Sequence, residues 1–168
     1  MKISKIVLFG LVLASSALFG LDDFKEVKNW NRRFASSGKL EIAWDDASEA
    51  MRFTASFGEK TKDRWVYPGI RVSEADLKAD FLEFEIRVET NPEGGPVSNC
   101  LVLFQTPKVN AGQLYYPIPG KEFKKVKLDL RKISSKLPGV RMIKIGLNFK
   151  AAAEGSIWIR NIAFTTKK

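Results

Sequence analysis

Residues 141–164 alternate apolar and polar side chains, and this pattern constrains the fold more than any other stretch of the chain. In residues 143–149 every second side chain is large and apolar, and residues 157–160 alternate in the same way. A period of two places the two sets on opposite faces of a β-strand. The link contains Glu154-Gly155-Ser156, so we expect the two arms to pair as an antiparallel hairpin at the centre of the core.

Similar patterns predict strands along the rest of the chain. We expect them at residues 40–44, 51–57, 65–67, 81–88, 100–105, 114–118 and 123–130, with the first two forming a hairpin. The segment 100–105 is apolar up to Gln105, which is typical of a central strand buried on both faces. Residues 73–79 are expected to form one helical turn with Ser73 as its cap. The chain has turn residues at short intervals and no long helical pattern, which predicts an all-β sandwich or barrel.

The N-terminus has the features of a signal peptide. Two lysines in residues 1–5 precede an apolar run, and Ser15 and Ala17 suit cleavage after residue 17, with a cut after residue 20 as the alternative. The apolar run is shorter than the about 20 residues that span a bilayer, so we favour cleavage over a membrane anchor. We therefore expect a secreted or periplasmic protein with no membrane span in its mature form, whose residues 21–168 form one domain.

Composition excludes several kinds of chemistry. The chain has no histidine, which removes imidazole general-base catalysis and histidine-ligated zinc or copper. Its single cysteine, Cys100, lies beside an apolar run and is expected to be buried rather than reactive. Of the 28 basic residues, loss of Lys2 and Lys5 leaves 26 against 19 acidic residues, a net charge of +7. The lysines are spread over many segments, so we expect no nucleic-acid partner.

Seven stretches of the chain follow one another in an order found in a known family. They are Leu21-Asp22-Asp23-Phe24, Trp30, Met51-Arg52-Phe53, Arg64-Trp65-Val66-Tyr67-Pro68, Asp80 to Ile86, Phe123 to Leu130 and Gly155 to Phe164. Together they resemble the galactose-binding-like jelly roll of non-catalytic carbohydrate-binding modules, and the related complex I intermediate-associated protein family. The resemblance implies a two-sheet antiparallel β-sandwich of the jelly-roll type and a carbohydrate partner. The matches are mainly core pattern, so they bear on the fold more than on the ligand.

The chain departs from this family at Arg160. Such families usually carry an aspartate there, in a region that in many of these modules helps hold a structural calcium. Arginine at this position speaks against such a site. Asp22 and Asp23 remain candidate oxygen ligands for calcium, with a solvated acidic turn as the favoured alternative. No other cofactor is expected.

Carbohydrate binding needs flat aromatic faces for the apolar faces of sugar rings and fixed polar groups for the hydroxyls. The candidate ligand-binding residues are aromatic and polar side chains expected on outward strand positions or in nearby loops: Trp65, Tyr67, Arg87, Gln105, Tyr115, Tyr116, Asn148, Trp158 and Arg160. For each aromatic residue, packing in the core is the alternative. Trp30 and Trp44 are expected in the core or at its edge.

Enzymatic functions find less support in the sequence. Glu83 and Glu85 share one face of a predicted strand, roughly 7 Å apart by strand rise, and glycoside hydrolysis needs two carboxylates across a cleft. However, the Glu-x-Asp-x-x-Glu strand signature of jelly-roll glucanases is absent from the sequence. The arginine, histidine and tyrosine set of jelly-roll polysaccharide lyases cannot form without histidine.

The sequence leaves three functions open. The favoured one is an exported, non-catalytic module, expected to be a monomer, that binds a glycan through one sheet face or its rim loops. The second is a secreted or periplasmic protein-interaction or assembly domain of the same fold, with all its aromatic residues in the core. The third is a carboxylate-based polysaccharide-degrading enzyme.

Overall fold

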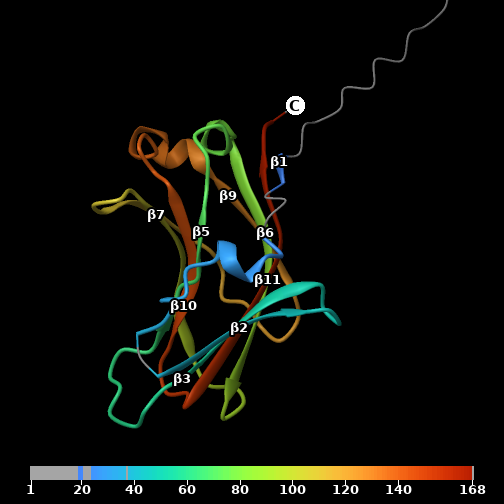
Figure 1. The fold of residues 1–168 in the computed structure, drawn as a ribbon, viewed down its shortest axis with the longest axis vertical. Coiled ribbons are helices and arrows are strands. Elements are labelled where there is room, and N and C mark those ends of the chain that lie inside the picture. The colour runs from blue at the N-terminus through green and yellow to red at the C-terminus, as the bar shows by residue number, and fades with distance from the viewer. Residues whose placement is uncertain (1–18, 21–23, 37, 168) are drawn as a thin grey trace, which may run out of the picture.

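The computed structural model describes residues 19–20, 24–36 and 38–167, which form two antiparallel β-sheets (Figure 1). The six-stranded sheet has the order β2 (Lys39–Asp45), β3 (Ala50–Ser56), β11 (Glu154–Thr165), β6 (Phe81–Asn91) and β9 (Lys124–Asp129), with β1 (Phe19–Gly20) also paired to β11. The five-stranded sheet has the order β4 (Trp65–Val66), β10 (Met142–Phe149), β7 (Val97–Gln105) and β8 (Asn110–Tyr115), with β5 (Gly69–Arg71) also paired to β10. The predicted all-β, two-sheet antiparallel sandwich is therefore confirmed.

Three short 3-10 helices lie between the strands: η1 (Val27–Asn29), η2 (Asp76–Lys78) and η3 (Leu130–Lys136). The turn predicted at residues 73–79 is present as η2. The backbone N–H of Ser73 donates to Oδ2 of Asp76 at 2.7 Å, and the N–H of Asp76 donates to Oγ of Ser73 at 3.2 Å. Within the described residues, none of the helices has the length and hydrophobicity needed to span a bilayer.

One apolar layer between the two sheets forms the core. In β6 every second side chain from Leu82 to Val88 is buried, as the alternation predicted. β10 and β11 contribute Ile145 and Ile159, both fully buried, in the same way. Cys100 also lies in this layer, as predicted, and burial raises the pKa of its thiol to about 11, which keeps it protonated at neutral pH.

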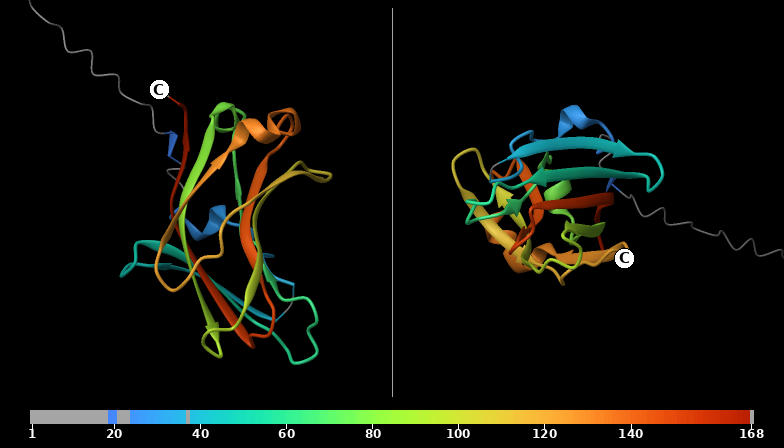
Figure 2. Two further views of the ribbon diagram at one scale, coloured as in Figure 1. Left: turned by 180° about the vertical axis from the view of Figure 1, so that it is seen from behind. Right: turned by 90° about the horizontal axis from the view of Figure 1, so that it is seen from below.

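The hairpin predicted over residues 141–164 is wrong, because β10 and β11 lie in different sheets. β10 pairs with β4, β5 and β7, whereas β11 pairs with β1, β3 and β6. The apolar sides of both strands belong to the same core layer, so the two strands contribute to it from opposite sheets. Residues 150–153 cross between the sheets at one end of the sandwich (Figure 2). Backbone N–H groups of this link donate to Pro96 and Asn91, at 2.9 and 2.8 Å.

Some strand bounds also differ from the prediction. The strand expected at residues 114–118 is β8, which begins at Asn110 and ends at Tyr115. Pro117 and Pro119 lack the backbone N–H that a continuing ladder would use. β5 begins at Gly69, two residues after the end of the strand expected at residues 65–67, and was not predicted.

Residues 1–17, the predicted signal peptide, lie outside the described residues, and the peptide stays a prediction. The strand β1 pairs Phe19 with Phe164 and Gly20 with Ala163. A cut after residue 17 would keep this strand in the mature chain, and a cut after residue 20 would remove it.

The segment before β2 closes one side of the core. Trp30 forms an isolated β-bridge with Ile70. The ring of Phe53, on β3, meets the rings of Trp30 and Phe34 edge to face, with centroids 4.7 and 5.4 Å apart. Phe53 and Phe34 have no exposed surface. Phe53 therefore joins the six-stranded sheet to the N-terminal segment.

Replacing Phe53 by alanine is expected to lower the free energy of unfolding by about 3–5 kcal/mol, because it leaves a cavity between β3 and the N-terminal segment. Urea unfolding of purified protein measures the change. The control is Val109→Ala at a position that is 61% exposed, where we expect a change within about 0.5 kcal/mol. Equal unfolding midpoints for the two variants would contradict this description of the core.

Candidate functional site

The outer face of the five-stranded sheet carries apolar side chains that do not belong to the core layer. Residues 100–105 were predicted to be buried on both faces, and on the outer face this holds for Leu101 but not for Leu103 and Gln105, which are half-buried. Val102 and Phe104 lie in the core, whereas Leu101 and Leu103 point to the other side of β7. Leu101 is 7% exposed, yet it does not belong to the core cluster.

Leu101 and Leu103 line a hollow on this outer face. Its volume is about 320 Å³, and its lining residues are Trp65, Tyr67, Leu101, Leu103, Gln105, Asn110, Lys144 and Asn148. Four of the nine predicted ligand-binding residues, Trp65, Tyr67, Gln105 and Asn148, are thus brought together here. They come from β4, the residue after it, β7 and β10. This hollow is the candidate functional site.

Tyr67 packs against β10 at Gly146, which has no side chain. A Cβ built on Gly146 would lie 2.7 Å from Cα of Tyr67 and 2.8 Å from its Cδ1, so glycine allows this close approach. The Tyr67 hydroxyl has two acceptors within reach, the carbonyl oxygen of Asn99 at 2.7 Å and Oδ1 of Asn148 at 2.9 Å. Burial raises the pKa of Tyr67 far above its usual range, so the hydroxyl stays a hydrogen-bond donor.

Trp65 lies beside Tyr67 and is half-buried. The ring centroids are 6.1 Å apart and the rings are tilted by 53°. Trp65 is also the cross-strand partner of Asn148 on β10. The Asn148 amide nitrogen donates to Oδ1 of Asp63 at 3.3 Å, while its oxygen accepts from Tyr67 at 2.9 Å. The hollow therefore holds one partly open aromatic ring next to an amide whose orientation is fixed.

Tyr115, a fifth predicted residue, extends the same face beyond the hollow. It is the cross-strand partner of Leu101, and directly opposed residues share a face. Its side chain is 62% exposed. The amide nitrogen of Gln113, two residues earlier on β8, donates to the Tyr115 hydroxyl at 2.9 Å. Aromatic rings are thus present at both edges of the five-stranded sheet.

Tyr116 is not on this surface, and its prediction as a ligand-binding residue is corrected. It is 6% exposed and its ring meets Phe84 edge to face at 5.5 Å. Its hydroxyl donates to the carbonyl oxygen of Gly146 at 2.8 Å. Neighbouring residues of an extended chain point to opposite sides, so Tyr115 and Tyr116 cannot both face outward.

The remaining predicted residues, Arg87, Trp158 and Arg160, lie on the outer face of the other sheet. The Arg87 guanidinium covers the Trp158 ring at 4.1 Å from its centroid, and the Trp158 indole N–H donates to Asp45 at 2.8 Å. Trp158 is only 5% exposed. Its ring is therefore already occupied by Arg87 and offers no free flat face.

Arg160, which departs from the family pattern, is held by the protein itself. Its Nε donates to Glu85 at 2.7 Å and its Nη1 donates to the Ser48 carbonyl at 2.9 Å. Asp22 and Asp23, the predicted calcium ligands, lie outside the described residues. Within the described ranges, no group of three or more acidic or cysteine side chains is placed to hold a metal ion.

Glu83 and Glu85, the carboxylates considered for catalysis, are both engaged in ion pairs. Lys127 bonds Glu83 at 2.8 Å and lowers the pKa of its carboxyl. Burial alone would raise the pKa of Glu85, but hydrogen bonds from Arg160 and Asn161 outweigh it, so the pKa is lowered. A glycosidase acid needs a raised pKa. This pair therefore has the environment of a solvated, ion-paired sheet face.

The sequence did not identify Leu101, Leu103 and Asn110 as site residues. The two leucines were assigned to a buried face because the run is apolar on both sides. A signal was present in the same run, since a strand with two apolar faces in a two-layer fold must have one of them outside the core.

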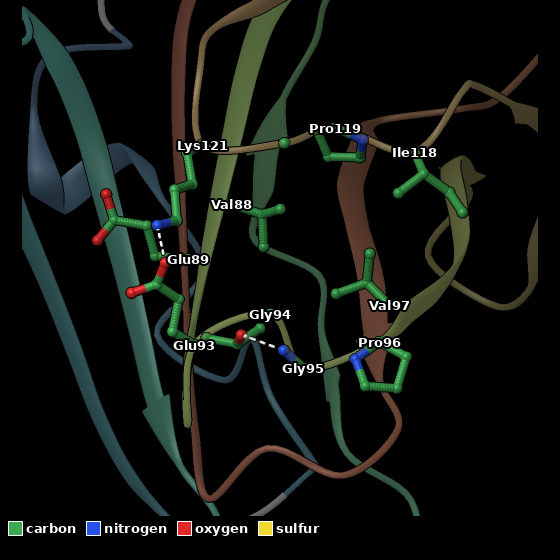
Figure 3. A pocket seen from close by; sticks show the side chains of 12 residues that line it. Val88, Glu89, Glu93, Gly94, Gly95, Pro96, Val97, Ile118, Pro119 and Lys121 are labelled. Carbon is green, nitrogen blue, oxygen red and sulfur yellow. Dashed lines mark hydrogen bonds and ion pairs between the residues drawn. The ribbon is translucent and has the colours of Figure 1, made fainter.

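A second hollow of about 610 Å³ lies at the loop end of the sandwich (Figure 3). It is formed by the loop after β6 and the segment before β9, which Glu93 and Lys121 join by an ion pair. Val88, Val97 and Ile118 are among its apolar lining residues. Although it is larger, none of its twelve described lining residues is aromatic. It therefore lacks the flat ring that distinguishes the hollow beside Trp65.

Comparisons with known proteins bear on the fold. No family model and no curated protein matches the chain. Among solved structures, it is similar to TmCBM27, a carbohydrate-binding module described for specific mannan recognition (TM-score 0.56, 19% identity, 86% of this chain and 92% of that chain). It is also similar to the family 11 carbohydrate-binding module of the cellulosomal cellulase Lic26A-Cel5E of Clostridium thermocellum (TM-score 0.53, 14% identity, 92% and 97%).

A third similar structure is CBM27-1 of Caldicellulosiruptor saccharolyticus in complex with mannohexaose (TM-score 0.51, 13% identity, 90% of this chain and 97% of that chain). The chain thus has the jelly-roll β-sandwich fold of carbohydrate-binding modules, as the resemblance implied. The link to the complex I intermediate-associated protein family stays a prediction.

Replacing Gly146 by alanine is expected to destabilise the protein by about 1–3 kcal/mol, the range for overpacking. The new Cβ would meet the Val66 carbonyl oxygen and the Tyr67 backbone, which cannot easily move aside. Chemical denaturation measures the change against Gly120→Ala, where no heavy atom lies within 4 Å of the new Cβ. Equal stability of the two variants would show that Tyr67 does not lie against β10.

Proposed function

We propose that this protein is an exported, non-catalytic carbohydrate-binding module that holds a glycan on the outer face of the five-stranded sheet. The observation that carries the proposal is the hollow in which the half-buried Trp65 and Asn148 lie beside the more deeply buried Tyr67 and Leu101. The fold shared with carbohydrate-binding modules supports it. Export rests on the predicted signal peptide, and the monomeric state stays a prediction.

The chemistry of the hollow suits a sugar ring. Trp65 is half-buried, so it can offer an indole surface to the C–H groups of a pyranose while its edge is held by the sheet. Leu101 and Leu103 continue the apolar surface on β7. The amides of Asn148 and Gln105 supply donors and acceptors of planar geometry for hydroxyl groups. Stacking gives affinity in this arrangement, and the amides give orientation.

A binding role is favoured over catalysis for this face. No carboxylate is among the described residues that line the hollow. Asp63 lies beside it and accepts a hydrogen bond from the Asn148 amide. The chain has no histidine to act as a general base. Glycoside hydrolysis and lyase chemistry both need such groups beside the reacting bond.

Affinity electrophoresis in gels that contain a panel of polysaccharides tests the proposal. Trp65→Ala and Tyr115→Ala are each expected to weaken binding by about 1–3 kcal/mol, the ordinary scale for an aromatic anchor. The matched control is Phe123→Ala, which removes an aromatic ring stacked with Arg160 and Arg87 on the opposite sheet face. This control is expected to retain the wild-type affinity, and circular dichroism would verify that all three variants are folded.

Two outcomes would contradict the proposal. If no polysaccharide in the panel retains the folded wild-type protein, the protein-interaction alternative is favoured. Loss of binding in the Phe123 variant with unchanged binding in the other two would move the site to the six-stranded sheet.

A further inference from the structure

Among the described residues that line the hollow beside Trp65, only Lys144 carries a charge. The other seven lining residues are aromatic, aliphatic or amide side chains. Lys144 is half-buried and belongs to β10, directly opposite Leu103 of β7. A glycan that occupies the hollow would therefore lie against a single positive charge.

The Lys144 side chain is held close to the sheet. Its partner on β5 is Gly69, where a Cβ would lie 3.1 Å from Cγ of Lys144 and 2.7 Å from Sδ of Met142. The absence of a side chain at position 69 lets both stems lie over β5. A lysine whose stem packs against backbone loses less conformational freedom when its ammonium binds a ligand.

No carboxylate of the described residues forms an ion pair with Lys144. Among the described residues, ion pairs join Lys125 and Lys127 to Glu83, Arg160 to Glu85 and Arg141 to Glu74, and none includes Lys144. On the six-stranded sheet the outward cations of β9 are thus paired with acids of the neighbouring strand. In the part of the chain that the structure describes, Lys144 has no such counter-charge.

A second cation lies along the same face. Arg71 lines an adjoining hollow that shares Gln105 with the first. It is exposed, and within the described chain it belongs to no ion pair. Arg71 lies two residues along β5 from Gly69, the partner of Lys144, which corresponds to roughly 7 Å. The positive potential therefore continues along the strand direction, where an extended polymer would lie.

We infer that the glycan of the proposed function is an acidic polysaccharide, and that Lys144 binds the carboxylate of a uronate residue. The inference rests on the proposed function and adds the class of sugar. The ammonium supplies one charge for one carboxylate, and the amides of Gln105 and Asn110 line the same hollow and can donate to its oxygens. A sulfate ester carries the same single charge but is tetrahedral, and we assign the carboxylate because two planar amides beside one cation match its planar shape.

The test compares wild-type protein, Lys144→Gln and Lys39→Gln by isothermal titration calorimetry. Lys39 is exposed at the edge strand of the other sheet and does not line the hollow, so its variant loses the same charge outside the site. The ligands are oligogalacturonate, the same oligomer with its carboxyl groups reduced to alcohols, a neutral β-mannan oligomer and a sulfated dextran. We expect the uronate to bind wild-type protein and Lys39→Gln equally.

Lys144→Gln is expected to bind the uronate about tenfold or more weakly, the scale of a hydrogen bond to a charged group. Raising salt from about 0.1 M to about 1 M, which shortens the screening length from about 10 Å to about 3 Å, should weaken wild-type binding more than binding by this variant. The carboxyl-reduced oligomer should bind both proteins with the same, lower affinity.

The outcomes separate the two proposals. Equal binding of neutral and acidic oligomers, unchanged in Lys144→Gln, would overturn the acidic-glycan inference and leave the proposed function in place. Equal or tighter binding of sulfated dextran through Lys144 would overturn the assignment of a carboxylate. Binding of none of the four ligands, together with no retention on the polysaccharide panel, would overturn both.

Discussion

The structure depends on a single apolar layer between the two sheets, to which each sheet contributes the side chains of its inner face. Each strand can give only every second side chain to that layer. Phe53 and Ile157 face each other in register on β3 and β11, and Ile145 belongs to the same layer from β10 of the other sheet. These side chains pack in the core. The side chains between them face outward, and they give the two outer faces of the sandwich their different chemistry.

The two outer faces use these side chains in different ways. On the six-stranded sheet, Glu83 and Glu85 pair with cations of adjacent strands, and Arg87 covers Trp158. Among the described residues of that face, these two acids are therefore ion-paired and the Trp158 ring is covered. On the five-stranded sheet, Leu101 and Trp65 lie in a shallow hollow with amides and one unpaired ammonium. A surface that leaves apolar rings and an uncompensated charge accessible is suited to a ligand rather than to solvent alone.

The alternation in the sequence was sufficient to predict the strands other than β1 and β5, the inward side chains of β6 and an all-β fold, and the family resemblance added the two-sheet sandwich. It could not assign strands to sheets, because pairing joins segments far apart in the chain. The hairpin over residues 141–164 failed for this reason, since β10 and β11 each pair with distant strands. The unknown strand pairing also limited the prediction of the ligand-binding site. Nine outward or loop residues could be named, but only the pairing separates Trp65 and Asn148 from Trp158 and Arg160 on the opposite face. Tyr116 faces the core because it follows the outward Tyr115 in an extended chain.

The most direct test of this account is a two-dimensional ¹H–¹⁵N NMR titration that follows the four tryptophan indole N–H signals as a bound polysaccharide is added. The indole N–H groups of Trp30 and Trp158 are bonded to Phe24 and Asp45 inside the protein, at 2.6 and 2.8 Å. The account predicts that the Trp65 signal shifts progressively while the Trp30 and Trp158 signals stay in place. A shift of the Trp158 signal with an unchanged Trp65 signal would contradict it, because the ligand would then occupy the other sheet.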